Sequence, residues 1–240
     1  MKIIKCKDYE EMSKKAFEIV KKEITENPKT NLCLPYGLTP LGLYKEMVSD
    51  YYTNHTSYQN VQFFNIDEFV PIAKNHPGSH YSYMKMNLLS FLNVPENHIH
   101  YPYGIDYLEC IKYEKLLQEY PIDLQVLGIG RNAHIGYAEP GTQKDEPTHI
   151  VTLAPSSREG IKRFFHNDLE KVPRFAITMG IGTILQAKKI LLLASGKNKA
   201  EAIQQMIENE PNPDCPASYL QEHPNVTVIL DEEAASLLKK

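Results

Sequence analysis

Side chains that can transfer protons are gathered in residues 122–140, IDLQVLGIGRNAHIGYAEP. The apolar first half of this segment predicts a buried strand, and the polar second half presents Asn132, His134 and Glu139 beyond the end of that strand. Histidine is the side chain best suited to proton transfer near neutral pH, and Glu139 can orient its imidazole. Gly130 allows the backbone to approach a ligand closely. The pattern indicates acid–base chemistry on a small polar molecule such as a sugar.

Two adjacent carboxylates, Asp67 and Glu68, follow another apolar run in the segment FFNIDEFV. Catalytic carboxylates are commonly positioned at the ends of strands, so either residue is a candidate general base. A pair of acidic residues after a strand is also typical of a solvated turn. The residues alone leave both interpretations open.

A turn in the segment LPYGLTPLG offers a place for a phosphate group. An apolar strand ends near Gly37, the turn continues through Leu38 and Thr39, and a helix is expected to begin at Pro40. The Thr39 hydroxyl is a good helix N-cap, and the free N–H groups of such an N-terminus bind phosphate. The same residues are equally consistent with a helix cap that has no ligand.

Two cations are candidates to hold that phosphate. Lys199 lies in the turn after the apolar run 190–194, and its ammonium is a compact charge suited to phosphate. Arg163 lies between Ile161 and two phenylalanines, and an arginine buried in apolar surroundings needs a partner. The alternatives are an ordinary exposed lysine and an arginine in a structural ion pair.

Short β-rich runs alternate with helical patterns along the chain, which predicts βαβ units around a mostly parallel sheet. The carboxyl ends of parallel strands meet at one edge of a sheet, so the side chains named above are expected to share a pocket there. The expected strands are 2–5, 31–34, 61–65, 99–101, 123–128, 149–153, 175–178, 190–194 and 226–230, and the expected helices include 9–26, 40–52, 107–119, 181–187 and 197–208.

The composition limits the classes of function. With 240 residues, 42% of them hydrophobic, the chain can bury a full core, and one α/β domain over residues 1–240 is expected. The net charge of −4 argues against a nucleic-acid surface, and no apolar run approaches the roughly 20 residues of a membrane span. The first residues contain no apolar signal-peptide core, so a cytoplasmic location is expected.

Neither a cofactor nor a metal is expected from the motifs. The run GIGRNA fits a loose dinucleotide-binding pattern, but it continues into a segment that is not an obvious helix. His76 and His80 are four residues apart, but Pro77 and Gly78 between them argue against the helical face that would make a metal pair. The four cysteines are far apart and predict no disulfide. A small molecule is therefore the expected partner.

Over nearly its whole length the sequence resembles the glucosamine-6-phosphate deaminase (isomerase) family, which is related to the 6-phosphogluconolactonases. The resemblance implies a modified Rossmann-like fold and the conversion of glucosamine 6-phosphate and water to fructose 6-phosphate and ammonium without a cofactor or metal. The motifs that carry it, in chain order, are FNIDEFV, HPGSHYSYM, LGIGRNAHIGYAEPG, RFF, VPRFAITMGIGTILQAKKILLLASGKNKAEAI and CPASYLQEHPNVTVILDEEAA.

The resemblance also implies a role for each candidate residue. Asp67 would move a proton between C2 and C1 of the open-chain sugar. His134, held by Glu139, would open the pyranose ring. The turn at Gly37, Leu38 and Thr39, together with Gly130, Arg163 and Lys199, would bind the substrate and its phosphate.

The sequence departs from the family in the proton-transfer loop and in the phosphate turn, where Tyr36 and Leu38 replace small or hydroxylic residues. The family has a GDGHIGFNEP-like run, whereas this chain has Asn132 in place of the aspartate and Ala138 in place of the asparagine. An amide cannot balance the charge of a histidinium, so a non-catalytic phosphosugar-binding protein is a second hypothesis. A lactonase like those of the sister family is a third. The altered loop leaves the sugar epimer, gluco or galacto, open.

A regulatory site is not expected. In allosteric members of the family, basic residues shortly after the catalytic loop bind an effector phosphate, whereas this chain has Pro147, His149 and Val151 there. The resemblance is therefore to the short, non-allosteric members. A homo-oligomer is possible, but no surface pattern defines one.

Overall fold

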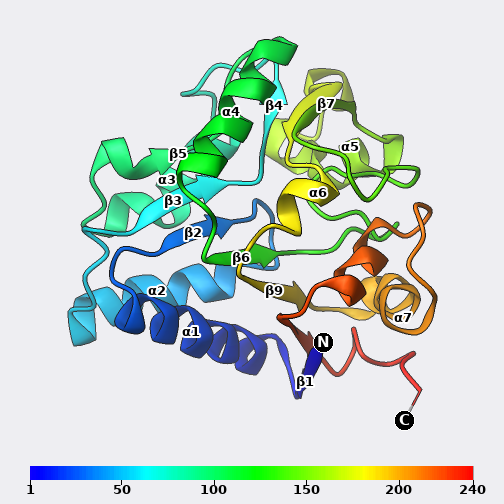
Figure 1. Cartoon of the computed structure of the whole chain (residues 1–240), viewed down its shortest axis with the longest axis horizontal. Coiled ribbons are helices and arrows are strands. Elements are labelled where there is room, and N and C mark those ends of the chain that lie inside the picture. The colour runs from blue at the N-terminus through cyan, green and yellow to red at the C-terminus, as the bar shows by residue number, and fades with distance from the viewer. Residues whose placement is uncertain (240) are drawn as a thin grey trace.

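Short strands rich in apolar residues form the centre of the molecule, because a parallel sheet covered on both faces buries most side chains of its inner strands. The computed structural model describes residues 1–239 and contains a seven-stranded parallel sheet with helices on both faces (Figure 1). Its strands are β1 (Lys2–Cys6), β2 (Asn31–Leu34), β3 (Gln62–Asn65), β5 (Ile99–His100), β6 (Leu124–Leu127), β9 (Lys189–Ala194) and β10 (Val226–Asp231).

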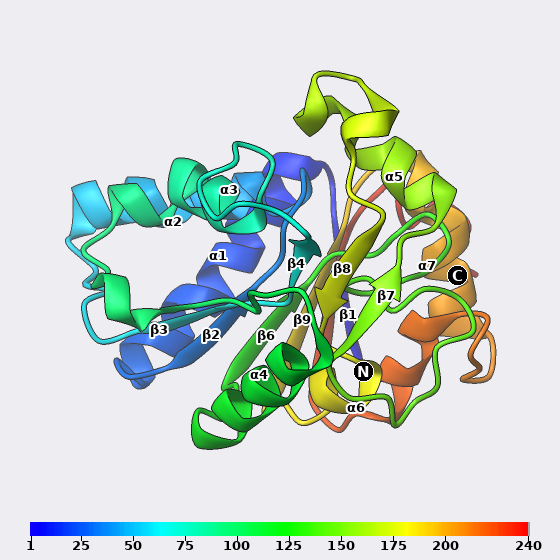
Figure 2. The ribbon, with the colours of Figure 1, turned by 90° about the horizontal axis from the view of Figure 1, so that it is seen from above.

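Side chains alternate between the two faces of the sheet, so each face has its own core. In β9, Leu191 and Leu193 pack in one buried cluster with apolar residues of α1 and α2, whereas Ile190 and Leu192 pack in another with residues of α4, α6 and α7 (Figure 2). The helices are α1 (Tyr9–Glu26), α2 (Leu41–Asn54), α3 (His80–Asn87), α4 (Tyr107–Glu119), α5 (Pro155–Ile161), α6 (Ile181–Ile184) and α7 (Ala200–Glu208). Among residues 1–239, no helix is both long enough and apolar enough to cross a membrane.

The order of the strands creates a crevice at the middle of the sheet. The order is β1-β10-β9-β6-β2-β3-β5, so the chain extends from β2 toward β3 and β5 on one side, and from β6 toward β9 and β10 on the other. At such a switch point the loops after the two central strands diverge, and ligands bind between them. The expected mostly parallel α/β sheet is therefore confirmed, with a defined place for a site between β2 and β6.

A second sheet of three antiparallel strands was not predicted from the sequence. It consists of β4 (Asp67–Val70), β8 (Phe175–Thr178) and β7 (His149–Thr152), with β8 in the middle. The runs 149–153 and 175–178 do form strands, but outside the parallel sheet. A single residue, Ile66, separates β3 from β4, so the apolar run in FFNIDEFV conceals the point at which the chain changes sheets.

The helices differ from expectation where they are short. The helix expected at 181–187 ends at Ile184, and the first turn of the helix expected at 197–208 is a 3₁₀ turn, Lys197–Lys199. Helices α3 and α5 were not predicted. The signal for α3 is the N-cap Ser79, whose side chain accepts a hydrogen bond from the backbone N–H of Ser82, but a proline and a glycine just before it obscure this signal.

Candidate active site

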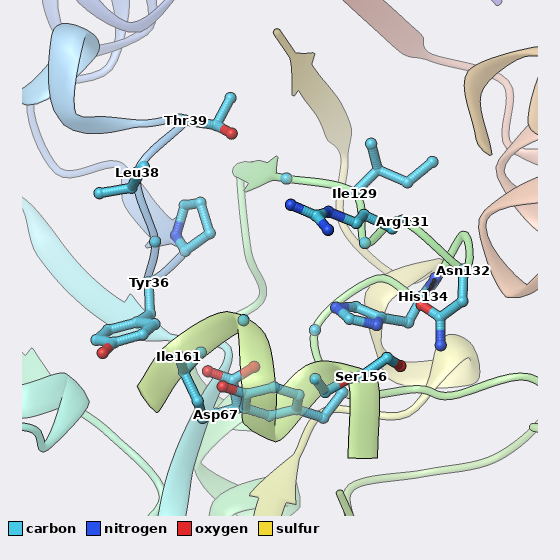
Figure 3. Close-up of a pocket in the computed structure, with 18 of the residues that line it drawn as sticks. Tyr36, Leu38, Thr39, Asp67, Ile129, Arg131, Asn132, His134, Ser156 and Ile161 are labelled. Carbon is cyan, nitrogen blue, oxygen red and sulfur yellow. Dashed lines mark hydrogen bonds between the residues drawn. The ribbon is translucent and has the colours of Figure 1, made fainter. Parts of the chain in front are cut away.

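A cavity of about 780 Å³ opens at the carboxyl ends of four neighbouring strands, β3, β2, β6 and β9 (Figure 3). It occupies the switch point of the sheet, and a segment formed by α5 and the 3₁₀ turn Lys162–Phe165 borders it. Nine of the ten site residues predicted from the sequence line it, and the tenth, Glu139, lies behind His134. The nine are Gly37, Leu38, Thr39, Asp67, Gly130, Asn132, His134, Arg163 and Lys199.

Glu139 is the centre of a hydrogen-bonded group behind the imidazole of His134. Its Oε2 accepts a hydrogen bond from Asn132 Nδ2 at 2.8 Å and lies 3.4 Å from His134 Nδ1, while Oε1 accepts one from Ser157 Oγ at 2.6 Å. Burial alone would raise the pKa of Glu139, but the contacts with His134, Ser157 and Asn132 lower it to about 2. The carboxylate is therefore ionised at neutral pH and favours a proton on His134 Nδ1, which leaves Nε2 as the nitrogen available to a ligand.

Asn132 contacts the carboxylate behind His134. An amide cannot itself balance the charge of a histidinium, and Glu139 was the residue expected to hold His134; in the structure the Asn132 amide donates to Glu139. Its Oδ1 also lies 3.4 Å from the backbone nitrogen of His134. Asn132 thus holds the carboxylate next to the imidazole.

Gly130 brings the backbone against the ring of His134. Its N–H donates to the carbonyl of His134 at 2.8 Å, closing a tight turn in which Ala133 has a φ of 63°. A Cβ at position 130 would lie 2.4 Å from atoms of the His134 ring. Only glycine fits there unless the imidazole moves.

The adjacent carboxylates Asp67 and Glu68 are buried and point to different partners. Neither is a solvated turn residue, because they are 6% and 1% exposed. Asp67 lines the cavity, and its Oδ1 lies 2.6 Å from Nδ1 of His80. Glu68 accepts hydrogen bonds from the backbone N–H groups of His80 and Tyr81 at the start of α3. Of the two, only Asp67 is placed to act on a ligand.

Three cations, Arg131, Arg163 and Lys199, line the cavity. Lys199 Nζ donates to the carbonyl of Ile129 at 2.6 Å, and burial, followed by the charges of Arg131 and Arg163, lowers the pKa of Lys199 to about 8. Figure 3 shows the Arg131 guanidinium pointing into the cavity from the loop that carries His134. Crowded cations that are held apart from carboxylates are suited to bind a phosphate.

Two expectations about the phosphate residues were wrong in detail. Arg163, a candidate to hold the phosphate, was expected to be buried among apolar residues, but it is exposed at the cavity wall, with its guanidinium 4.9 Å from the centre of the Phe164 ring. Thr39 was expected to be the N-cap of α2, but the cap is Pro40 and no side chain caps this helix. The Thr39 side chain is therefore free of that role and lines the cavity.

Some cavity residues were not identified from the sequence. His80 was considered only as half of a metal pair, and its contact with Asp67 depends on the unpredicted helix α3. Tyr36 stacks on His80, with 4.0 Å between the centres of the two rings. Tyr36 and Arg131 both lie inside motifs in which other residues were chosen as site candidates. Ser157 comes from the unpredicted helix α5. Among residues 1–239, no group of three or more His, Cys, Asp or Glu side chains is arranged to hold a metal ion.

One cavity at the switch point of the parallel sheet thus contains a buried carboxylate, an imidazole oriented by a second carboxylate, and three cations. This combination is typical of an enzyme that moves protons on a small anionic substrate. The chain belongs to the family of glucosamine-6-phosphate isomerases and 6-phosphogluconolactonases, whose sequence model matches residues 8–229. The resemblance read from the motifs is thereby confirmed.

Individual relatives agree with this family. The chain is 48% identical to a glucosamine-6-phosphate deaminase of Thermoanaerobacter pseudethanolicus, over 99% of this chain and 95% of that protein. It is 46% identical to one of Clostridium novyi, over 99% of this chain and the whole of that protein. A solved structure described as a monomeric glucosamine-6-phosphate deaminase superposes with a TM-score of 0.96 at 40% identity, covering 99% of this chain and 100% of that one. A 6-phosphogluconolactonase from Trypanosoma cruzi shares the fold, with a TM-score of 0.79 at 21% identity over 100% of this chain and 97% of that one.

Proposed function

We propose that this chain converts glucosamine 6-phosphate and water to fructose 6-phosphate and ammonium. The observation that carries the proposal is the presence of Asp67 and the His134–Glu139 pair in one cavity with the cations Arg131, Arg163 and Lys199. The names of relatives at 46–48% identity support the same reaction.

The first step is opening of the pyranose ring, and the proposal assigns it to His134. The imidazole accepts the proton of the C1 hydroxyl at Nε2 and returns a proton to the ring oxygen O5 as the C1–O5 bond breaks. Glu139 is ionised, so it stabilises the imidazolium that forms between these two transfers. Among residues 1–239, His134 Nδ1 has no hydrogen-bond partner and lies 3.4 Å from Glu139 Oε2; catalytic hydrogen bonds are often long before the substrate binds and tighten in the complex.

The second step is isomerisation, which the proposal assigns to Asp67. Its carboxylate removes the proton from C2 of the open-chain aldehyde and gives it to C1, while a second proton passes from the amine nitrogen to O1. The aldehyde thereby becomes an alcohol and the C2 amine becomes an imine. Water then adds to the C2=N bond, and ammonia leaves to give the ketone. Burial of Asp67 excludes bulk water from the carboxylate and keeps the transferred proton near the sugar.

The cations Arg131, Arg163 and Lys199 supply binding energy remote from the reacting carbons. The phosphate group is proposed to lie among Thr39, Arg163 and Lys199, with the turn at Gly37 and Leu38 completing that end of the cavity. Contacts with a non-reacting phosphate hold C1 and C2 in place against Asp67.

The alternative functions have less support. The non-catalytic hypothesis depended on Asn132, which instead donates to Glu139 and leaves the charge beside His134 intact. The lactonase hypothesis depends on relatives at 21% identity, which establish the fold alone. The sugar epimer, a homo-oligomeric state and a cytoplasmic location remain predictions.

The test is ammonium release by the purified protein from glucosamine 6-phosphate and, in parallel, from galactosamine 6-phosphate, with the variant Asp67→Asn as control. Release from the gluco epimer that disappears in the variant is expected. Binding of both sugars without release would contradict the proposal and favour a binding protein. Hydrolysis of 6-phosphogluconolactone faster than ammonium release would favour a lactonase.

A further inference from the structure

His80 is a buried histidine that touches the carboxylate proposed as the base. It is 1% exposed and lies at the first position of α3. Its Nδ1 is 2.6 Å from Oδ1 of Asp67 and 2.8 Å from the backbone carbonyl oxygen of the same residue. Both neighbours are acceptors, so Nδ1 carries a proton whatever the charge of the ring.

The other ring nitrogen of His80 makes the tautomer unambiguous for a neutral ring. Nε2 is buried and, among residues 1–239, has no hydrogen-bond partner. In the neutral tautomer with its proton on Nδ1, Nε2 is only an acceptor, and no N–H group is left unpaired. The imidazole packs between two aromatic rings: it stacks on Tyr36, with ring centres 4.0 Å apart, and lies edge-on to Phe69, with ring centres 4.5 Å apart.

The backbone around His80 is fixed by the second carboxylate of the pair. Glu68 Oε1 accepts a hydrogen bond from the N–H of His80 at 2.9 Å, and Oε2 accepts one from the N–H of Tyr81 at 3.0 Å. An anion at the N-terminus of a helix is favoured by the helix dipole. Glu68 thus fixes the backbone at the start of α3, while Asp67 contacts the ring of His80.

The oxygen of Asp67 that does not contact His80 faces the cavity. Oδ2 lies 3.7 Å from the point where a Cβ of Gly136 would be, and Gly136 lines the same cavity. Among residues 1–239, no group donates a hydrogen bond to Oδ2. One oxygen of the carboxylate is therefore held by His80, and the other is left with its lone pairs for a ligand.

We propose that His80 is a positioning residue for the isomerisation step: by donating from Nδ1 to Asp67, it fixes the carboxylate and makes Oδ2 the oxygen that carries the proton between C2 and C1. The inference rests on the proposed function, since it assigns a role within that reaction. Burial alone would lower the pKa of His80, but the Asp67 carboxylate raises it above its ordinary value, which shows how closely the two groups are coupled. Without His80, the carboxylate can rotate and share its basicity between both oxygens.

Two substitutions separate the N–H donor from the ring. His80→Phe keeps an aromatic ring beside Tyr36 but removes the donor. His80→Asn keeps an N–H near the position of Nδ1 but removes the ring. His100→Phe is the matched control, because His100 also stacks on an aromatic ring, that of Phe64 at 4.6 Å, but is not among the residues that line the cavity.

The readouts are kcat and KM for ammonium release and the isotope effect on kcat with glucosamine 6-phosphate deuterated at C2. For His80→Phe we expect kcat to fall about 10- to 100-fold, the effect of losing one hydrogen bond to a charged group, with KM within about threefold of wild type. The isotope effect should equal or exceed that of wild type, because proton transfer from C2 becomes slower. His80→Asn should recover about tenfold in kcat, and His100→Phe should match wild type.

The isotope effect keeps the test decisive if a variant is partly unfolded, since it does not depend on the concentration of active enzyme. The inference is overturned if His80→Phe retains kcat within twofold of wild type, if its isotope effect falls toward one, or if His80→Asn is no more active than His80→Phe. A wild-type protein that releases no ammonium would instead refute the proposed function. The two failures are therefore distinguishable.

Discussion

Replacing Glu139 with glutamine tests whether a single carboxylate both orients His134 and stabilises the loop around it. The carboxylate oxygens accept from Ser157 Oγ at 2.6 Å and from Asn132 Nδ2 at 2.8 Å, with His134 Nδ1 at 3.4 Å. Glutamine has one oxygen and one NH₂ group, so it cannot accept on both sides. An NH₂ group that faces His134 would favour the tautomer without a proton on Nδ1, which is the wrong one for ring opening.

The magnitude follows from the pKa of Glu139. Its fall from 4.5 to about 2 corresponds to about 3 kcal/mol of stability at neutral pH. The side chain is 11% exposed, so screening by solvent reduces this figure little. Because the pKa is lower in the folded protein than in the unfolded chain, this stability is present above pH 4.5 and is lost as the pH falls toward 2.

The activity of Glu139→Gln should be lower than that of wild type by about 10²- to 10⁴-fold, the usual contribution of a general acid–base group.

The assays are urea unfolding of wild type and Glu139→Gln at pH 7 and pH 3, together with kcat for ammonium release at pH 7. The difference in free energy of unfolding should be about 3 kcal/mol at pH 7 and about half of that at pH 3. Ser157→Ala is the control, since it removes one hydrogen bond but not the charge, and should cost about 1–3 kcal/mol at pH 7. Because Ser157 is only one of the contacts that lower the pKa of Glu139, its cost should change less between pH 7 and pH 3 than that of Glu139→Gln. A Glu139→Gln penalty of equal size at both pH values would refute the electrostatic reasoning.

Three further predictions concern the pocket. In wild type, kcat/KM should decline as the pH rises through about 8, where half-buried Lys199 loses its charge beside Arg131 and Arg163, whereas Lys199→Arg should show no decline there; parallel pH profiles would contradict this. Gly130→Ala should lower kcat about 100-fold, because its Cβ would lie 2.4 Å from the ring of His134, and a variant with wild-type kcat would show that the ring position is unimportant. Finally, we predict hyperbolic kinetics that N-acetylglucosamine 6-phosphate does not change; sigmoidal kinetics relieved by that compound would show a regulatory site.

The location of the site could be predicted from the sequence because it depends on the parallel sheet. The apolar runs of β2, β6 and β9 are each followed by residues with an evident chemical property: the turn at Thr39, the imidazole of His134 and the ammonium of Lys199. Parallel strands place the residues that follow them at one edge, so recognising the strands was sufficient to bring these groups together.

The partners of these groups could not be predicted in the same way. Asn132 donates to Glu139 because the chain reverses tightly between them, with Ala133 at a φ of 63° and Gly136 at 56°, and no periodicity encodes such a turn. Arg163 was expected to be buried because its neighbours in sequence are apolar. In and beside the 3₁₀ turn Lys162–Phe165, only Phe165 is buried, whereas Ile161 and Phe164 are half-buried and line the cavity with the exposed Arg163.

The antiparallel sheet explains why the proposed base and the proposed ring-opening group keep a fixed separation. Asp67 is paired in register with Thr178 of β8, and the Thr178 hydroxyl accepts a hydrogen bond from the backbone N–H of Tyr137 at 3.0 Å. Tyr137 lies in the loop of His134, so one residue of β8 contacts the strand of one group and the loop of the other. A Cβ on Gly136 would lie 2.8 Å from that same hydroxyl, which shows how closely the loop is packed on the strand. The parallel sheet therefore determines where the pocket lies, whereas the small antiparallel sheet sets the distance across which a sugar must fit between carboxylate and imidazole.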